Sequence, residues 1–111
     1  MRAIFFVLKN PDLLKPLIDE LKKNEVTGGT LLASSGLAKE MAETSEFALF
    51  GTLRSILAEE YKDTKTLIFV ANEEKEKIIL DSIKKIVGDL DQPNSGIVFA
   101  MPVDYTIGLK Y

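Results

Sequence analysis

The chain has 111 residues, of which 46% are hydrophobic and 28% charged, and its formal net charge at pH 7 is −3. These values are typical of a globular protein, and we expect a single domain over residues 1–111. Acids and bases are mixed along the chain, so the sequence argues against a basic surface for nucleic acid or for an anionic membrane.

The chain contains neither cysteine nor histidine. This excludes a cysteine nucleophile, a Ser-His-Asp triad and a metal site built from thiolates or imidazoles, and we expect neither a metal nor an enzymatic activity. The apolar run over residues 3–8 is too short for the core of a signal peptide or for a membrane span. We therefore expect a cytoplasmic protein without membrane insertion.

The first third of the chain predicts a strand, a helix and a second strand. Residues 2–8 are rich in Ile, Phe and Val, which favours a strand. Asn10-Pro11 is a typical helix start, and apolar residues follow it at helical spacing. Pro16 falls early enough in this helix to be tolerated with a small distortion. After a turn that contains two glycines, residues 30–33 predict the second strand.

The last half of the chain repeats this order. Residues 64–71 are almost entirely apolar and predict a third strand, after which Asn72 suits the N-cap of a second helix. Gly88 follows that helix, where it can adopt the left-handed conformation that ends helices. Residues 97–101 predict the fourth strand, and residues 105–109 a short edge segment.

This order of elements predicts an α+β fold, a ferredoxin-like βαββαβ sandwich with both helices on one face of a four-stranded sheet. The strands are apolar at odd and even positions alike, since Phe5 and Val7 lie between Ile4, Phe6 and Leu8. A strand with one face in water would alternate. The face without helices therefore needs a cover. That cover is either another subunit, which we favour, or the middle segment of the same chain.

The middle segment, residues 37–63, lies where a short turn would connect strands two and three. A connection of this length usually has a function or a structure of its own. A helical turn is predicted over residues 37–41, and a longer helix begins near residues 44–45. This insert is either a helix packed on the sheet or on a neighbouring subunit, or an arm that docks on a partner protein. The apolar side chains for such docking are Phe47, Leu49, Phe50 and Leu53.

The polar loop after the second helix, residues 88–96, is a candidate ligand corner. It begins at Gly88, and its turn-forming residues could direct several backbone N–H groups to one point. Asp89 and Asp91 could bind a hard cation, although two carboxylates in a turn are usually only turn formers.

Three charged side chains are further candidates for ligand contacts. Lys9 follows the first strand and either reaches a phosphate at a junction between subunits or lies in solvent. Lys39 and Glu40 either contact a ligand at the base of the insert or lie on an exposed helix face. In a small ferredoxin-fold enzyme, the less favoured alternative, Glu40, Lys39 or Tyr61 would be the acid–base group.

Three short segments and one glycine follow one another along the chain. The segments are residues 25–31 (Glu-Val-Thr-Gly-Gly-Thr-Leu), 96–99 (Gly-Ile-Val-Phe) and 103–107 (Val-Asp-Tyr-Thr-Ile), and the glycine is Gly36, after the second strand. In this order and spacing the chain resembles the nitrogen-regulatory PII signalling proteins and their PII-like relatives. The resemblance covers most of the chain outside residues 37–63. It implies a homotrimer whose sheets face inward, and a nucleotide site between subunits. It also implies that the segment between strands two and three docks on a regulated transporter or enzyme.

Carried over by position, the resemblance implies four residues of an adenine nucleotide site. Thr30, Gly36 and Gly96 stand where the family lines this site, and Lys110 stands where the family has a C-terminal basic residue. We therefore expect a PII-like regulatory protein that binds a small effector at the subunit junction. The alternative is an interaction or structural module that binds no ligand.

The chain departs from the family at three other positions. Ile97 stands in place of a phosphate-binding lysine, Gly108 in place of a second basic residue, and Glu40 in place of a glutamine that helps to bind a metal and an oxo-acid. Each charge-assisted contact contributes about 1.5–3 kcal/mol, so these changes weaken a triphosphate site by several kcal/mol.

Overall fold

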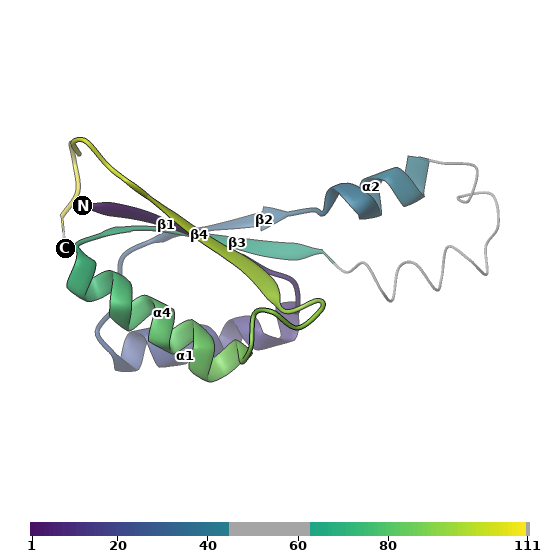
Figure 1. The fold of residues 1–111 in the computed structure, drawn as a ribbon, viewed down its shortest axis with the longest axis horizontal. Helices are drawn as coiled ribbons and strands as arrows, with labels where there is room; N and C mark the ends of the chain where they lie inside the picture. Colours follow the sequence, from purple (N-terminus) through teal and green to yellow (C-terminus); the bar gives the residue numbers. More distant parts are fainter. Residues whose placement is uncertain (45–62, 111) are drawn as a thin grey trace.

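The computed structural model describes residues 1–44 and 63–110, and in these residues four strands and three α-helices form a mixed α+β fold (Figure 1). The predicted α+β class is therefore confirmed. The elements are β1 (Arg2–Leu8), η1 (Pro11–Leu13), α1 (Leu14–Lys23), β2 (Thr30–Ser34), α2 (Leu37–Thr44), β3 (Thr64–Ala71), α4 (Glu73–Val87) and β4 (Gly96–Pro102).

The strands form one antiparallel sheet in the order β2-β3-β1-β4. Phe5 of the central strand β1 pairs with Ile68 of β3 on one side and with Phe99 of β4 on the other. Helices α1 and α4 cover the same face of this sheet (Figure 1). The sheet thus has two edges, β2 and β4, and one face without helices.

Local sequence signals mark the turn that leads into α1 and both ends of α4. The side chain of Asn10 accepts a hydrogen bond from the backbone N–H of Asp12 at 3.1 Å, and the single turn η1 then leads into α1. Because α1 begins only at Leu14, Pro16 lies in its first turn, where the missing N–H is not needed. Asn72 caps α4 by accepting from the N–H of Lys75 at 2.8 Å, and Gly88 follows α4 with φ +87°.

The hydrophobic core lies between the sheet and the two helices. Ile4, Phe6 and Leu8 of β1 have no exposed surface. Leu17 of α1 and Ile79 of α4 meet them from the helical layer and are equally buried. Alternate residues of the central strand therefore anchor both helices, and the intervening residues point to the opposite face.

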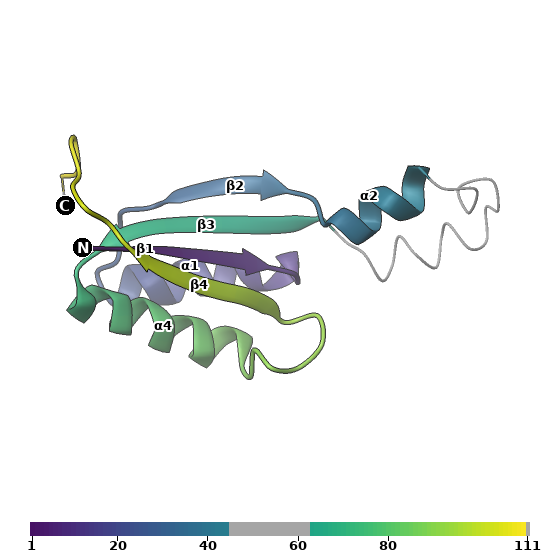
Figure 2. The ribbon, with the colours of Figure 1, turned by 45° about the horizontal axis from the view of Figure 1, so that its top comes forward.

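The opposite face of the sheet is apolar and uncovered in the described residues. Phe5 and Val7 of β1 lie on it, with Phe99 as the register partner of Phe5. Its exposed apolar side chains on the edge strands are Leu32, Ile97, Phe99 and Met101. Helix α2 extends beyond the end of the sheet and does not cover this face (Figure 2). The expected two-sided apolar sheet is thus present.

Two predictions about the rest of the chain have different outcomes. The predicted helical turn over residues 37–41 is confirmed and extends to Thr44. The predicted edge segment over residues 105–109 is wrong, because none of these residues joins the sheet. Pro102 has no N–H, and Gly108 has φ +87°, a conformation that strands do not use.

The longer helix predicted from residues 44–45 onward lies outside the described residues. Among the helices that are described, none combines the length and the apolar character that crossing a membrane requires.

Candidate functional site

A cavity of about 390 Å³ lies at the end of the sheet where α2 leaves it. We call it the root pocket, because its wall includes the first residues of the insert. The ends of β1 and β2 and the starts of β3 and β4 meet there. The lining residues are Val7, Lys9, Ser34, Ser35, Gly36, Leu37, Ala38, Lys39, Thr64, Thr66, Asn94 and Ile97.

Three hydroxyl groups form a connected cluster in the wall of the root pocket. The Ser34 hydroxyl lies 2.5 Å from the Thr64 hydroxyl and 2.8 Å from the Thr66 hydroxyl. The cluster exists because β2 and β3 pair in a register that sets Ser34 opposite Thr64. A hydroxyl can donate one hydrogen bond and accept two, so such a cluster can reorient its donors toward an anion.

Two lysines lie at the same pocket but have different partners. The ammonium group of Lys39 forms an ion pair with Asp63, and its hydrogen bond lowers the pKa of the Asp63 carboxyl. This pair joins the start of α2 to the residue before β3. In the described parts of the chain, Lys9 forms no ion pair. Lys9 is therefore the cation that an incoming anion can engage without breaking an ion pair.

The neighbouring Glu40 is held at the base of the insert. Its carboxylate accepts a hydrogen bond from the Ser35 hydroxyl at 2.6 Å. Glu40 does not line the root pocket itself, so its negative charge stands next to the pocket rather than in it.

Gly96 adjoins the root pocket and has a structural reason to be glycine. Its φ is +145°, and a Cβ atom there would lie 2.6 Å from the carbonyl oxygen of Val7 and 2.8 Å from the ring of Phe6. The close approach of β4 to β1 therefore depends on the missing side chain. This packing role is separate from the ligand contact that the resemblance implies.

Of the eight predicted ligand residues, Lys9, Gly36 and Lys39 line the root pocket. Glu40 and Gly96 lie beside it. The other three residues lie elsewhere. Thr30 is at the opposite end of β2, Gly88 borders a separate hollow with Asp89 and Asp91, and Lys110 is exposed in the C-terminal segment. Phe47, Leu49, Phe50 and Leu53, the predicted partner contacts, lie outside the described residues.

The loop after α4 uses several of its polar groups for hydrogen bonds within itself. The N–H of Asp91 donates to the Asp89 carboxylate at 2.9 Å, and the N–H of Gln92 donates to the Asp89 carbonyl at 3.2 Å. The Ser95 hydroxyl donates to the carbonyl of Leu90 at 3.0 Å. These donors are therefore already satisfied inside the loop. The described residues also hold no group of three or more potential metal ligands.

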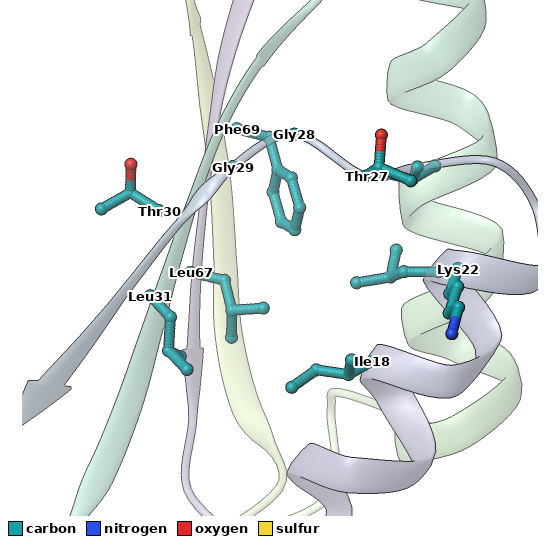
Figure 3. Close-up of a pocket in the computed structure, with 11 residues that line it drawn as sticks. Ile18, Lys22, Thr27, Gly28, Gly29, Thr30, Leu31, Leu67 and Phe69 are labelled. Atoms are coloured by element: carbon teal, nitrogen blue, oxygen red, sulfur yellow. The ribbon is translucent and has the colours of Figure 1, made fainter.

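A second cavity, of about 330 Å³, lies between α1 and the edge strand β2 (Figure 3). We call it the α1–β2 groove. Leu67 and Phe69 form its floor, and Ile18 and Leu31 flank it. The side chain of Thr30 lies on the other side of the strand and points away from it (Figure 3).

Sequence reasoning missed the hydroxyl cluster and the α1–β2 groove. Ser34 and Thr64 are 30 residues apart and meet only through the pairing of β2 with β3. The sequence did contain a signal for the cluster, because β2 ends and β3 begins with a hydroxyl residue, Ser34 and Thr64. The groove had no local signal, because it depends on how α1 sits beside an edge strand.

We compared the chain with known protein families and with curated proteins. No family model matches it, and no curated protein matches it. The geometry of the two cavities and the resemblance to PII proteins are therefore the basis for a proposed function.

Proposed function

We propose that this chain is a non-enzymatic, PII-like regulatory protein. It assembles into a homotrimer, binds a small anionic effector at the junctions between its chains, and transmits binding to a partner protein through the insert at residues 37–63. The resemblance favours an adenine nucleotide as the effector, and the chemistry of the root pocket favours one with few phosphates. The partner would be a transporter or an enzyme.

The topology supports a ferredoxin-like fold as the framework. The strand order β2-β3-β1-β4 and the shared face of α1 and α4 are what two successive βαβ crossovers with interleaved strands produce. The PII-like proteins that the chain resembles have this fold.

The open face of the sheet supports the oligomer. Phe99 of the edge strand is 47% exposed, and Leu32, Ile97 and Met101 are exposed on the same sheet. Contiguous apolar surface of this kind usually marks an interaction site. In a homotrimer, the three equivalent faces would bury one another, which removes this surface from water without any further protein.

The observation that carries the proposal is the position of the root pocket. One cavity touches Lys9 after β1, Gly36 before α2 and Lys39 within α2. An anion that engages Lys9 there also lies against the first turn of the insert. Binding can therefore shift the Lys39–Asp63 pair that joins the two ends of the insert.

A site between chains supports the remaining residue assignments. Thr30 begins β2 and Lys110 follows the end of β4, whereas the root pocket lies at the end of β2 and the start of β4. One chain alone therefore does not bring these two residues to its own root pocket. In a trimer, the root pocket of one chain and the opposite sheet end of the next chain could meet. This arrangement is the one that the PII resemblance implies.

The chemistry of the root pocket favours few negative charges on the ligand. It offers the ammonium of Lys9, the hydroxyl cluster and the amide of Asn94, while Val7 and Ile97 supply apolar wall. Ile97 takes the position where the family has a phosphate-binding lysine. A monophosphate, a cyclic nucleotide or a carboxylate therefore suits this pocket better than a triphosphate.

Ile97 also favours a second candidate function. Ile97 and Leu37 both line the pocket and are both exposed, and a protein partner could cover the apolar surface that they present. In that case the chain is an interaction module without a ligand. The two functions differ in whether any small molecule stabilises the fold.

The proposal is tested by measuring the mass of the protein in solution and then its thermal stability with candidate ligands. The panel is ATP, ADP, AMP, cyclic nucleotides, S-adenosylmethionine, 2-oxoglutarate and bicarbonate. A ligand at about 100 times its Kd stabilises the protein by about 2.7 kcal/mol. The variants K9Q and S34A should lose this gain, whereas K84Q on the outside of α4 should keep it.

Either of two results would overturn part of the proposal. A monomeric mass at all concentrations contradicts the trimer. A trimer that no ligand on the panel stabilises favours the interaction module instead.

A further inference from the structure

We propose that the C-terminal segment of one chain, residues 103–110, docks into the α1–β2 groove of a second copy, with Tyr105 and Ile107 as its anchors. The inference rests on the proposed oligomer but adds a contact that the open sheet face does not require. It assigns an occupant to the α1–β2 groove, which lies at the start of β2, whereas the root pocket lies at the end of that strand.

The groove presents apolar walls and one positive charge. Ile18 of α1 is 43% exposed and Leu31 of β2 is 48% exposed, although both flank a cavity whose floor is buried. Lys22 lines the groove on the α1 side (Figure 3). In the described residues Lys22 has no ion-pair partner, so its ammonium is available to an incoming carboxylate.

The C-terminal segment presents the complementary features. Tyr105 is 78% exposed and Ile107 is 91% exposed, the two highest values among the large apolar side chains of the described residues. Asp104, directly before them, forms no ion pair within the parts of the chain that the structure describes. Two large apolar side chains and one carboxylate thus match a groove with two exposed apolar walls and one ammonium.

The geometry favours a second copy over the same chain. The segment leaves β4 and rises on the side of the sheet opposite the helices, whereas the groove lies beside α1 on the helical side (Figure 1). Moreover, β4 and β2 are the two opposite edges of the sheet. A contact from the β4 edge of one copy to the β2 edge of the next is heterologous, and such contacts close into a ring when the rotation allows it.

Site-specific disulfide cross-linking tests this contact. Because the native sequence contains no cysteine, only the introduced cysteines can form disulfides. Isotope-labelled L31C is mixed with unlabelled I107C, refolded together and mildly oxidised. We expect a disulfide-linked heterodimer, identified by its mixed mass, as the main product. The matched control replaces L31C with D81C, which lies exposed on α4, and should yield only background cross-linking.

A second measurement uses variants of the segment without cysteine. The double variant Y105S/I107S should raise the concentration at which the oligomer half-dissociates by about tenfold or more, because anchor residues dominate such contacts. The variant T106S between them should leave it unchanged. K22E should weaken assembly, and the pair K22E with D104K should restore it.

The outcomes separate this inference from the proposed function. A trimer whose L31C–I107C mixture cross-links no better than the control overturns the docking and leaves the trimer standing. An L31C/I107C double variant that cross-links only within one chain overturns the second copy as the occupant. A protein that stays monomeric overturns the docking together with the proposed trimer.

Discussion

The rings of Phe5 and Phe99 stack across β1 and β4, with centroids 4.9 Å apart and planes inclined by 6°. The register sets the two residues directly opposite each other. This stacked pair lies on the face of the sheet that α1 and α4 leave open. Substitutions in this pair should therefore report, through the stability of the fold, whether another chain covers that face.

Phe99→Ala removes one ring of this pair. We expect the free energy of unfolding to fall by about 2 kcal/mol from the lost apolar contact and stacking alone. If the face is the subunit interface, the loss is larger and depends on protein concentration. Denaturant unfolding at two protein concentrations measures both effects. Phe99→Leu is the control, since it keeps most of the apolar volume, and a concentration-independent loss would argue against a buried face.

Gly96→Ala should be strongly destabilising. The new Cβ would meet the Val7 carbonyl at 2.6 Å in a backbone conformation with φ +145°. We expect a loss of about 3 kcal/mol in the free energy of unfolding, from overpacking and backbone strain. Gly36→Ala is the matched control, because a Cβ atom added there would meet nothing within 4 Å and its φ is not positive. Its effect should stay within about 0.5 kcal/mol. Equal effects of the two changes would contradict the close approach of β4 to β1.

Lys85→Gln tests the ion pair that joins α4 to α1. The Lys85 ammonium donates to the Glu20 carboxylate at 2.9 Å, and this hydrogen bond lowers the pKa of Glu20 below its ordinary value of 4.5. In the variant, a carboxyl titration followed by NMR should report a higher pKa for Glu20. Lys84→Gln, one residue earlier on the same helix, should leave that pKa unchanged.

The same pair has a predictable pH dependence. Because the folded-state pKa of Glu20 is lowered, the pair stabilises the fold above the ordinary pKa, and this contribution is lost as the pH falls through the folded-state value. The melting temperatures of the native protein and of K85Q should therefore differ at pH 7 and converge in acid. A difference that persists below the folded-state pKa would show that Lys85 acts through packing instead.

Asn72→Ala removes the cap of α4. The Asn72 side chain accepts the N–H of Lys75 at 2.8 Å, and without it that donor at the helix start loses its partner. We expect a loss of about 1 kcal/mol in the free energy of unfolding, measured by denaturant titration. Asn72→Ser retains a capping oxygen and should lose far less. If both variants were equally destabilised, the cap would not be the cause.

Local patterns in the sequence account for most of the secondary structure. The predicted bounds of β1 and β3 agree with the structure, and Asn72 caps α4 as expected. Asn10 caps the single turn η1, and α1 begins after that turn, at Leu14. The predicted bounds of β2 and β4 were one residue short at one or both ends. These features depend on residues within a few positions of one another, so a linear pattern is sufficient to predict them.

The structure brings only some of the predicted ligand residues together, for a reason of geometry. Lys9 follows the end of β1, Gly36 follows the end of β2, and Lys39 lies in the first turn of α2. They converge because both strands end, and α2 begins, at the same end of the sheet. Thr30 was grouped with Gly36 although they lie at opposite ends of β2. Sequence position alone does not predict which residues lie at the same end of a sheet, because this depends on the order and direction of the strands.

By itself, the sequence determined the α+β class, the two helices that cover the sheet, the cap of α4 and the two-sided apolar strands. These follow from periodicity, capping residues and composition, which act over short distances along the chain. Only the tertiary structure decided that Ser34 meets Thr64, that a groove opens beside β2, and that the segment after Pro102 stays outside the sheet. Each of these depends on strand order and register between distant segments, which long-range packing sets and no local pattern encodes.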